Sequence, residues 1–211
     1  METNQDFWHR FFGVALQGKS YLNLLYLLIM LPLGIIYFTF IVTGFSISIS
    51  LLILIIGIFI AFLFLVSVRG ISTFHLHYAS SLLGFELPTK VKTTTIGKGF
   101  FAHLKKVLAD GKTYTSMFYM FLELPLGITY FTIIISLLAT SVAFILTPIL
   151  WVLNDEGVLF LSGDNWILNE DFGYTFLLCL LGIVLYVGTL HLGRLLAKIE
   201  EFLCKNLLVR I

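Results

Sequence analysis

The sequence predicts an all-α integral membrane protein, and its composition and its long uncharged runs are the observations that predict it. Hydrophobic residues make up 59% of the 211 residues and charged residues only 12%, about half the share in an ordinary soluble domain. So few polar side chains cannot cover the surface of a water-soluble fold. A soluble enzyme and an intrinsically disordered chain are therefore excluded.

Three runs without Asp, Glu, Lys or Arg locate the spans. They cover residues 20–68, 124–154 and 172–193. Because a helix crosses the hydrocarbon core in about 20 residues, the first run holds two helices, joined by a turn at Gly44-Phe45-Ser46. The four predicted spans are 21–43, 48–68, 114–138 and 173–193. The apolar stretch from Ser116 to Leu153, about 38 residues, is too long for one upright crossing, so the extension of the third span over 139–153 crosses, re-enters or tilts.

The distribution of charge predicts the orientation. All 13 Lys and Arg residues lie on one side of the four-span arrangement, whereas the loop 154–171 on the other side carries five carboxylates and no basic residue. The positive-inside rule then places both termini in the cytoplasm and the protein in the plasma membrane. The opening METNQDFWHRFF is polar and aromatic, so a cleavable signal peptide is not expected.

The chain contains an internal repeat. A shift of 93 residues aligns positions 7–43 with 100–136 at 15 identical residues, and a second block aligns at a shift of 125, where Arg69 meets Arg194. The sequence therefore predicts two tandem pseudo-symmetric hairpins, a first repeat over 1–92 and a second over 93–211. With two spans each, both copies start in the cytoplasm, so their pseudo-two-fold axis should follow the membrane normal and not form an inverted repeat.

Cytoplasmic interfacial amphipathic helices are predicted on both sides of each hairpin. They are a helix before Gly18, a helix over 70–86, a helix over 99–110 and a C-terminal helix after 193, with a polar linker from 88. The apolar positions of the second and fourth are Ile71, Phe74, Tyr78, Leu82 and Phe85, and Leu195, Leu196, Ile199, Phe202 and Leu203. Such helices lie in the headgroup plane or pack against one another or a partner, and the sequence leaves both open.

The repeated motif G-K-[S/T]-Y marks the point where each hairpin enters the membrane. Lys suits the headgroup level, Ser or Thr caps the new helix, and Tyr anchors at the interface. The predicted interfacial anchors, with the arginines that end the even-numbered spans, are Lys19, Tyr21, Arg69, Lys112, Tyr114 and Arg194.

The repeated motif P-L-G-I lies near the middle of the first span of each hairpin. Proline kinks a helix and the nearby glycine permits close approach of a neighbour. The sequence predicts either a plain packing kink or a hinge that lines an apolar ligand pocket. The residues of that hinge or pocket are Tyr26, Pro32, Gly34, Tyr37, Phe38, Tyr119, Glu123, Pro125, Gly127, Tyr130 and Phe131.

Glu123 is the one acidic residue inside a predicted span, and it aligns with Met30 of the first copy. A carboxylate at that depth costs about 2.5–3.5 kcal/mol on insertion scales, so it marks a functional position or reaches toward the interface. If it stays buried it needs a partner, and His191 or Arg194 qualifies only if the fold brings one of them to its depth.

No metal site, cofactor or catalytic group is predicted. His75 and His77 diverge by about 200° on a helix, so they do not share a metal easily. Cys179 lies in a span and Cys204 in the predicted cytoplasmic tail, so they are not expected to form a disulfide. Without a recognisable nucleophile, acid–base pair or basic nucleic-acid patch, the chain is not expected to be an enzyme or to bind nucleic acid.

The repeated Y-x4-Y-x4-LPLGI-x-YF-T, with spans that end in Arg and an amphipathic helix, resembles the putative sensor domain family. The resemblance rests on Leu31-Pro32-Leu33-Gly34 with Arg69, and on Leu124-Pro125-Leu126-Gly127 with Arg194. That family comprises four-span prokaryotic modules, often N-terminal to histidine kinases. The resemblance implies an input module in signal transduction, and because the sequence stops at Ile211, a stand-alone one.

Three functions follow from these observations. The first is a membrane-embedded sensor that signals through its cytoplasmic amphipathic helices to a separate cytoplasmic or membrane protein. The second is a small transporter or permease subunit that uses Glu123, and the third a lipid-binding protein without a switch. Membrane lipid is the partner common to all three, and a homo-oligomer is compatible with each.

Overall fold

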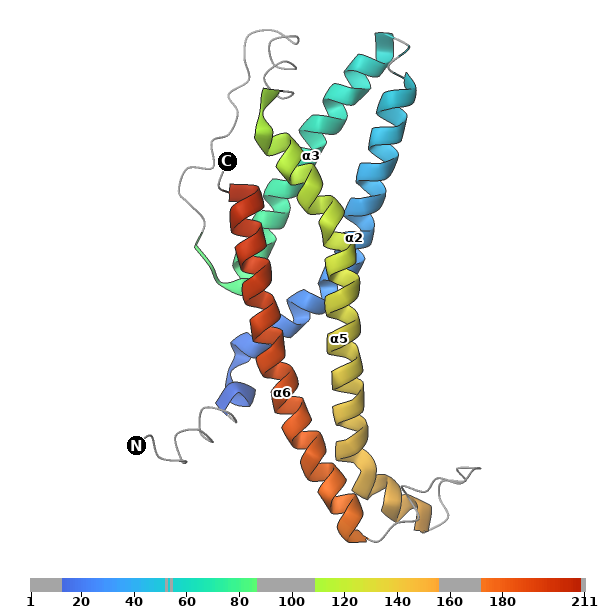
Figure 1. The fold of residues 1–211 in the computed structure, drawn as a ribbon, viewed down its shortest axis with the longest axis vertical. Helices are drawn as coiled ribbons and strands as arrows, with labels where there is room; N and C mark the ends of the chain where they lie inside the picture. The colour runs from blue at the N-terminus through green and yellow to red at the C-terminus, as the bar shows by residue number, and fades with distance from the viewer. Residues whose placement is uncertain (1–12, 52, 54, 87–108, 156–171, 210–211) are drawn as a thin grey trace. The chain divides into compact units, whose positions relative to one another are not determined.

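The computed structural model describes residues 13–51, 53, 55–86, 109–155 and 172–209, and every regular element among them is helical (Figure 1). Four long α-helices form the fold: α2 (Gly18–Leu51), α3 (Ile55–Leu83), α5 (Gly111–Asp155) and α6 (Phe172–Cys204). A short 3-10 helix, η1 (Val14–Leu16), precedes α2, and a π-helical segment, η2 (Lys205–Val209), follows α6.

All four α-helices are long and apolar enough to cross a membrane. The apolar segments are Gly18–Leu51, Ile56–Leu83, Gly111–Leu153 and Gly173–Leu208. Because a helix satisfies its backbone hydrogen bonds internally, each of these helices can expose apolar side chains to lipid. The prediction of an all-α, multi-pass membrane protein with four spans is confirmed.

The predicted turn at Gly44-Phe45-Ser46 is wrong, because α2 continues through it to Leu51. Gly44 is a packing residue instead: a Cβ there would overlap the ring of Phe64 on α3. The serines that follow do not break the helix either, since Ser50 Oγ donates to the Ser46 carbonyl at 2.8 Å. An isolated glycine among apolar residues therefore serves close approach and not chain reversal.

Helices α3 and α6 run on past Arg69 and Arg194 without a break, so the span ends predicted at these arginines are wrong. The interfacial position of the segments that follow stays a prediction. Helix α3 ends at Gly84, whose φ of 71° suits glycine and whose N–H bonds the Ser80 carbonyl at 2.9 Å. The arginines do not stop the helices because polar side chains of α2 and α5 satisfy their guanidinium groups, as described below.

The apolar stripes predicted for these continuations are divided between buried and exposed positions. Phe85 and Leu196 are buried, whereas Phe74 and Phe202 are 65% and 66% exposed, as residues facing lipid or a partner would be. The buried face comprises Val68, Ser72, His75, Leu76, Ala79 and Leu83 on α3, and Leu196, Ala197, Glu200 and Cys204 on α6. Counting apolar residues missed this face because its centre carries polar side chains.

The third predicted span and its extension form one helix, because α5 is continuous over 45 residues. Figure 1 shows the last turns of α5 turning away from the line of the preceding ones. Four predicted features lie outside the described residues: most of the N-terminal interfacial helix, the linker from 88, residues 99–108, and residues 156–171 of the acidic loop.

The chain packs as two compact units. Unit 1 comprises Met1–Leu24 and Thr132–Arg194, and unit 2 comprises Leu25–Phe131 and Leu195–Ile211. Each unit takes segments from both predicted repeats. The division into repeats at 92 and 93 concerns sequence similarity and stays a prediction.

In unit 2, α2 and α3 form an antiparallel hairpin (Figure 1). Its core is a cluster of buried side chains, joined by Met120 of α5: Tyr37, Ile41, Phe64, Leu65 and Val68. The rings of Phe40 and Phe64 lie 5.6 Å apart between centroids. These apolar contacts fix the register of the two helices.

Helices α2 and α5 touch backbone to backbone in unit 2. A Cβ on Gly34 would lie 2.8 Å from the Glu123 carbonyl oxygen, and a Cβ on Gly127 would lie 2.9 Å from the Met30 carbonyl oxygen. The contacts are reciprocal, because Gly34 is equivalent to Gly127, and Met30 to Glu123, at the repeat shift of 93. Such close approach is the established use of glycine between membrane helices.

The direction of α5 in unit 2 differs from the prediction. Three contacts with α3 keep a constant offset of 44 residues: Arg69 with Thr113, Ser72 with Ser116, and His75 with Tyr119. A constant offset means that these segments run parallel, so α5 runs antiparallel to α2. The expectation that the two P-L-G-I segments run in the same direction is therefore wrong for unit 2. A sequence repeat predicts a two-fold relation but does not encode the direction of its axis.

Each unit contains one equivalent arginine contact. In unit 2, Arg69 donates from Nε to Thr113 Oγ1 at 2.9 Å and pairs with Asp110 at 2.6 Å. In unit 1, Arg194 donates from Nε to Ser20 Oγ at 3.0 Å and from a terminal nitrogen to Gln17 at 2.6 Å. The partners are equivalent at the shift of 93, so each arginine contacts the G-K-[S/T] motif of the other repeat.

Candidate functional site

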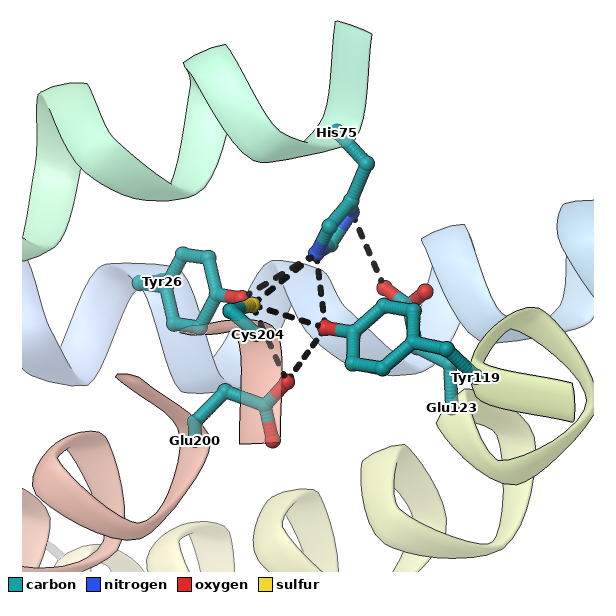
Figure 2. A network of polar contacts seen from close by, with 6 residues as sticks. All are labelled: Tyr26, His75, Tyr119, Glu123, Glu200 and Cys204. Carbon is teal, nitrogen blue, oxygen red and sulfur yellow. Dashed lines mark hydrogen bonds and ion pairs between the residues drawn. The ribbon is translucent and has the colours of Figure 1, made fainter. Parts of the chain in front are cut away.

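Six side chains meet in the interior of unit 2 (Figure 2). We call them the polar core cluster: Tyr26 of α2, His75 of α3, Tyr119 and Glu123 of α5, and Glu200 and Cys204 of α6. Each is at most 1% exposed. All four helices therefore contribute to one buried polar site within an otherwise apolar bundle.

Helical spacing explains how two helices supply two groups each. Tyr119 and Glu123, and likewise Glu200 and Cys204, are four residues apart and so share one face of their helix. The sulfur of Cys204 lies 3.8 Å from Glu200 Oε1. These pairs direct four polar groups inward from α5 and α6.

The hydroxyl of Tyr119 lies at the centre of the polar core cluster. It donates to Glu200 Oε1 at 2.5 Å, and it lies 2.9 Å from His75 Nε2 and 3.1 Å from Cys204 Sγ. Figure 2 shows these contacts converging on the phenol oxygen. Because a phenol has one proton, it can donate to only one of the three neighbours.

Glu123 lies on the far side of the His75 ring from Glu200. Its Oε1 is 3.3 Å from His75 Nδ1, which is ion-pair distance, although the two atoms do not meet hydrogen-bond geometry. The other face of the cluster is aromatic: Tyr37 contacts the His75 ring edge-on at 5.5 Å between centroids, and the hydroxyl of Tyr26 lies 3.4 Å from His75 Nε2. The imidazole is thus enclosed by both carboxylates and three phenol rings.

The polar core cluster holds more polar atoms than it satisfies. Within the described residues, four of its buried atoms have no hydrogen-bond partner: His75 Nδ1, both oxygens of Glu123, and Oε2 of Glu200. Each such atom costs about 1–3 kcal/mol by mutational measures. Stability alone does not favour such a site, so its polar groups call for a functional explanation.

The structure brings some of the predicted pocket residues together and separates others. Tyr26, Tyr119 and Glu123 belong to the polar core cluster, Tyr37 packs on it, and Gly34 and Gly127 make the backbone contacts beside it. Pro32 and Pro125 are exposed and do not line it. Tyr130 is buried, Phe131 is half-buried, and the half-buried Phe38 contacts the Phe121 ring at 5.1 Å.

The predicted interfacial anchors divide in the same way. Tyr21 and Tyr114 are 44% and 55% exposed, as interfacial aromatics would be, and Lys19 is exposed. Lys112 is half-buried, and its backbone N–H donates to Asp110 Oδ1 at 3.1 Å. Arg69 and Arg194 are half-buried in the contacts described above. Arg194, which the sequence offered as a conditional partner of Glu123, instead bonds Gln17 and Ser20. The neighbour of Glu123 is His75.

Sequence reasoning missed His75, Glu200 and Cys204 as site residues. All three lie in the continuations of α3 and α6 that were taken for interfacial helices. A signal was present, because Glu200 and Cys204 form a polar i, i+4 pair on a largely apolar helix, as do Tyr119 and Glu123. Together the cluster supplies two carboxyl groups, an imidazole, a thiol and two phenols, a set suited to holding a cation.

Comparison with known proteins gives one finding. A family model described as Putative sensor matches residues 26–208, a range that includes every residue of the polar core cluster. No curated protein and no solved structure matches the chain.

Proposed function

Because the chain belongs to the Putative sensor family, whose members are not typically enzymes, we propose that it is a membrane-embedded input module of signal transduction. In this proposal the polar core cluster receives the signal. The continuations of α3 and α6 beyond Arg69 and Arg194 pass it to a separate protein. The sensor-like character follows from the family, and the mechanism and the partner are our proposal.

One observation carries this proposal: a single buried site takes polar groups from all four helices. A ligand that pairs with His75, Glu123 and Glu200 changes the forces between α3, α5 and α6 together. Such a ligand binds one arrangement of the helices more tightly than another, and this difference in affinity is what shifts the population between them. Both oxygens of Glu123 and Oε2 of Glu200, which have no hydrogen-bond partner within the described part of the chain, supply the binding energy, because a ligand would satisfy them.

The continuations of α3 and α6 are suited to the output. His75 belongs to the same unbroken helix as the exposed Phe74, and Glu200 and Cys204 to the same helix as the exposed Phe202. A helix without a break transmits displacement along its length. These exposed aromatic faces provide surface that a partner helix could contact.

Expression profiling of the native host tests the signalling role. We expect deletion of the gene to change a defined set of transcripts. Glu200→Gln should reproduce that set, because the variant removes a carboxyl group that the proposed ligand contacts. Glu201→Gln is the matched control, since Glu201 lies next in sequence, pairs with Lys205 at 2.5 Å and is partly exposed. Its profile should equal that of the wild type.

Two results would overturn the proposal. One is a deletion strain whose transcripts match the wild type under every stimulus that changes them. The other is a Glu200→Gln profile that matches Glu201→Gln while deletion has a clear effect. Immunoblots of membranes confirm that both variants accumulate equally.

We also propose, from the complete segregation of the basic residues in the sequence, that the protein lies in the plasma membrane with both termini in the cytoplasm. This orientation requires α2 and α5 to cross the membrane in the same direction, which the contacts of unit 2 do not support, so labelling has to decide it.

A cysteine introduced at Asp164 or at Lys98, in a Cys179→Ser background that keeps the buried Cys204, tests this orientation in intact cells. The background protein without an introduced cysteine is the labelling control. We expect an impermeant maleimide to label the cysteine at 164 and not the one at 98. Labelling at 98 would overturn the proposal and would instead follow from the antiparallel direction of α5 against α2 in unit 2.

A further inference from the structure

The donors of the polar core cluster indicate which chemical class of ligand it binds. That this ligand is a signal rests on the proposed function, whereas its binding can be tested on the purified protein. Three side chains of the polar core cluster are metal-ligand types: His75, Glu200 and Cys204. Each is buried, and their ligand atoms all lie within 4.8 Å of one another. We propose that these three residues bind one divalent transition-metal ion of the zinc class.

The distances between the donors approach those of a tetrahedral site. With zinc–sulfur bonds of about 2.3 Å and zinc–nitrogen or zinc–oxygen bonds of about 2.1 Å, adjacent ligand atoms lie about 3.6 Å apart. Cys204 Sγ is 3.9 Å from His75 Nε2 and 3.8 Å from Glu200 Oε1. A shift of about 0.2–0.3 Å brings each of these two pairs to tetrahedral spacing. The third pair, His75 Nε2 and Glu200 Oε1, lies within 4.8 Å and closes further as the ion binds.

The hydroxyl of Tyr119 lies among the same three donors, at 2.5–3.1 Å from each. A cation in this position either displaces the phenol or takes it as a fourth ligand. Both require Tyr119 to move, and Tyr119 belongs to α5, whereas the other donors belong to α3 and α6. Metal binding is thereby coupled to the positions of three helices.

Glu123 provides a second, independent observation. A histidine that binds a metal through one nitrogen commonly directs its other nitrogen to a carboxylate, which fixes the tautomer and the ring orientation. His75 directs Nε2 at the donors and has its Nδ1 3.3 Å from Glu123 Oε1. Among the described residues, both Glu123 oxygens and Glu200 Oε2 are buried without a hydrogen-bond partner, so the site has unsatisfied capacity on both sides of the imidazole.

The charges select the class of cation. A dication bound by the Cys204 thiolate, the Glu200 carboxylate and a neutral His75 imidazole gives a net charge of zero, which burial in an apolar bundle favours. The thiol proton of Cys204 leaves to solvent as the metal–sulfur bond forms. Calcium and magnesium prefer oxygen ligands alone, whereas a nitrogen, sulfur and oxygen set suits zinc and its neighbours.

Cobalt(II) binding to the full chain in detergent tests the proposal, because a thiolate–cobalt bond has its own charge-transfer absorption. We expect the wild type to bind one Co²⁺ with that absorption, and Zn²⁺ to displace it. Cys204→Ser should lose the absorption, and Glu123→Gln should bind about 10–100-fold more weakly as an orienting residue. Cys179→Ser and His77→Gln are the controls, and should match the wild type. Cys179 donates to the Ile145 carbonyl at 3.6 Å, and His77 is exposed and bonds the Thr73 carbonyl.

The result that overturns the proposal is a folded wild type that binds no stoichiometric Co²⁺, or a Cys204→Ser protein that keeps the absorption. Circular dichroism checks folding, and His75→Gln replaces Cys204→Ser if the latter does not fold. The two proposals fail separately. A Glu200→Gln effect on transcripts without Co²⁺ binding would leave a sensor of another ligand, whereas Co²⁺ binding without a deletion phenotype would leave a metal site in a protein that is not a sensor.

Discussion

Glu123→Met is expected to stabilise the protein by about 1–4 kcal/mol while it abolishes the signalling response. Both carboxyl oxygens of Glu123 are buried without a hydrogen-bond partner in the described structure, and replacing a buried polar group whose hydrogen bonds are unmet by an apolar side chain of similar volume is often stabilising by that amount. The repeat supplies the replacement, because the equivalent position holds Met30, which is buried in α2. Equilibrium unfolding in mixed micelles measures the change.

The matched control is Glu201→Met, which removes a partly exposed carboxylate and should change the free energy of unfolding by no more than about 1 kcal/mol. The reverse exchange, Met30→Glu, should destabilise the protein strongly, since it buries a third carboxyl group in unit 2 in addition to Glu123 and Glu200. A Glu123→Met protein that is less stable than the wild type would show that the His75–Glu123 contact is worth more than its geometry indicates.

Gly34→Ala is expected to destabilise the protein by about 1–3 kcal/mol, the usual cost of overpacking. The new methyl carbon would lie 2.8 Å from the Glu123 carbonyl oxygen and 2.9 Å from Leu124 Cα. Both atoms belong to the backbone of α5, so they cannot rotate away and the two helices must separate. Gly127→Ala should cost a similar amount, because its contacts with Met30 and Leu31 are reciprocal.

Combining Gly34→Ala with Gly127→Ala tests whether the two glycines belong to one helix contact or act independently. Once one alanine has separated α2 from α5, the second meets less resistance, so the combined cost should be smaller than the sum. Gly70→Ala in α3 is the control: no atom of the described residues lies within 4 Å of its Cβ position, and alanine should stabilise that helix by up to about 1 kcal/mol. Additive costs at Gly34 and Gly127 would contradict the shared contact.

The number of helices was predictable because the length of an apolar run is a property of composition. Their ends were not, since Gly44, Arg69 and Arg194 each resemble a helix end in sequence. Each is accommodated inside a helix by a contact far away in the chain: Gly44 by Phe64, Arg69 by Thr113, and Arg194 by Ser20. Local pattern cannot anticipate a partner that only the fold supplies.

Half of the polar core cluster was predictable from the sequence. Tyr26 and Tyr119 were found through the repeat, and Glu123 because a carboxylate in a span is conspicuous. The other residues, His75, Glu200 and Cys204, were placed outside the membrane once the arginines before them were taken as span ends. The direction of α5 was missed because a repeated sequence is equally compatible with parallel and inverted copies.

The reciprocal contact at Gly34 and Gly127 also has a mechanical consequence. Two helices that touch at a single backbone crossing can turn about it as about a pivot, with little loss of contact. Glu123 contributes its carbonyl to that crossing and its side chain to the polar core cluster. From Gly34 to Leu51 the helix extends about 25 Å, so a turn of about 5° at the pivot would move the far end of α2 by about 2 Å. A ligand the size of one ion could in this way produce a displacement large enough for a neighbouring protein to detect.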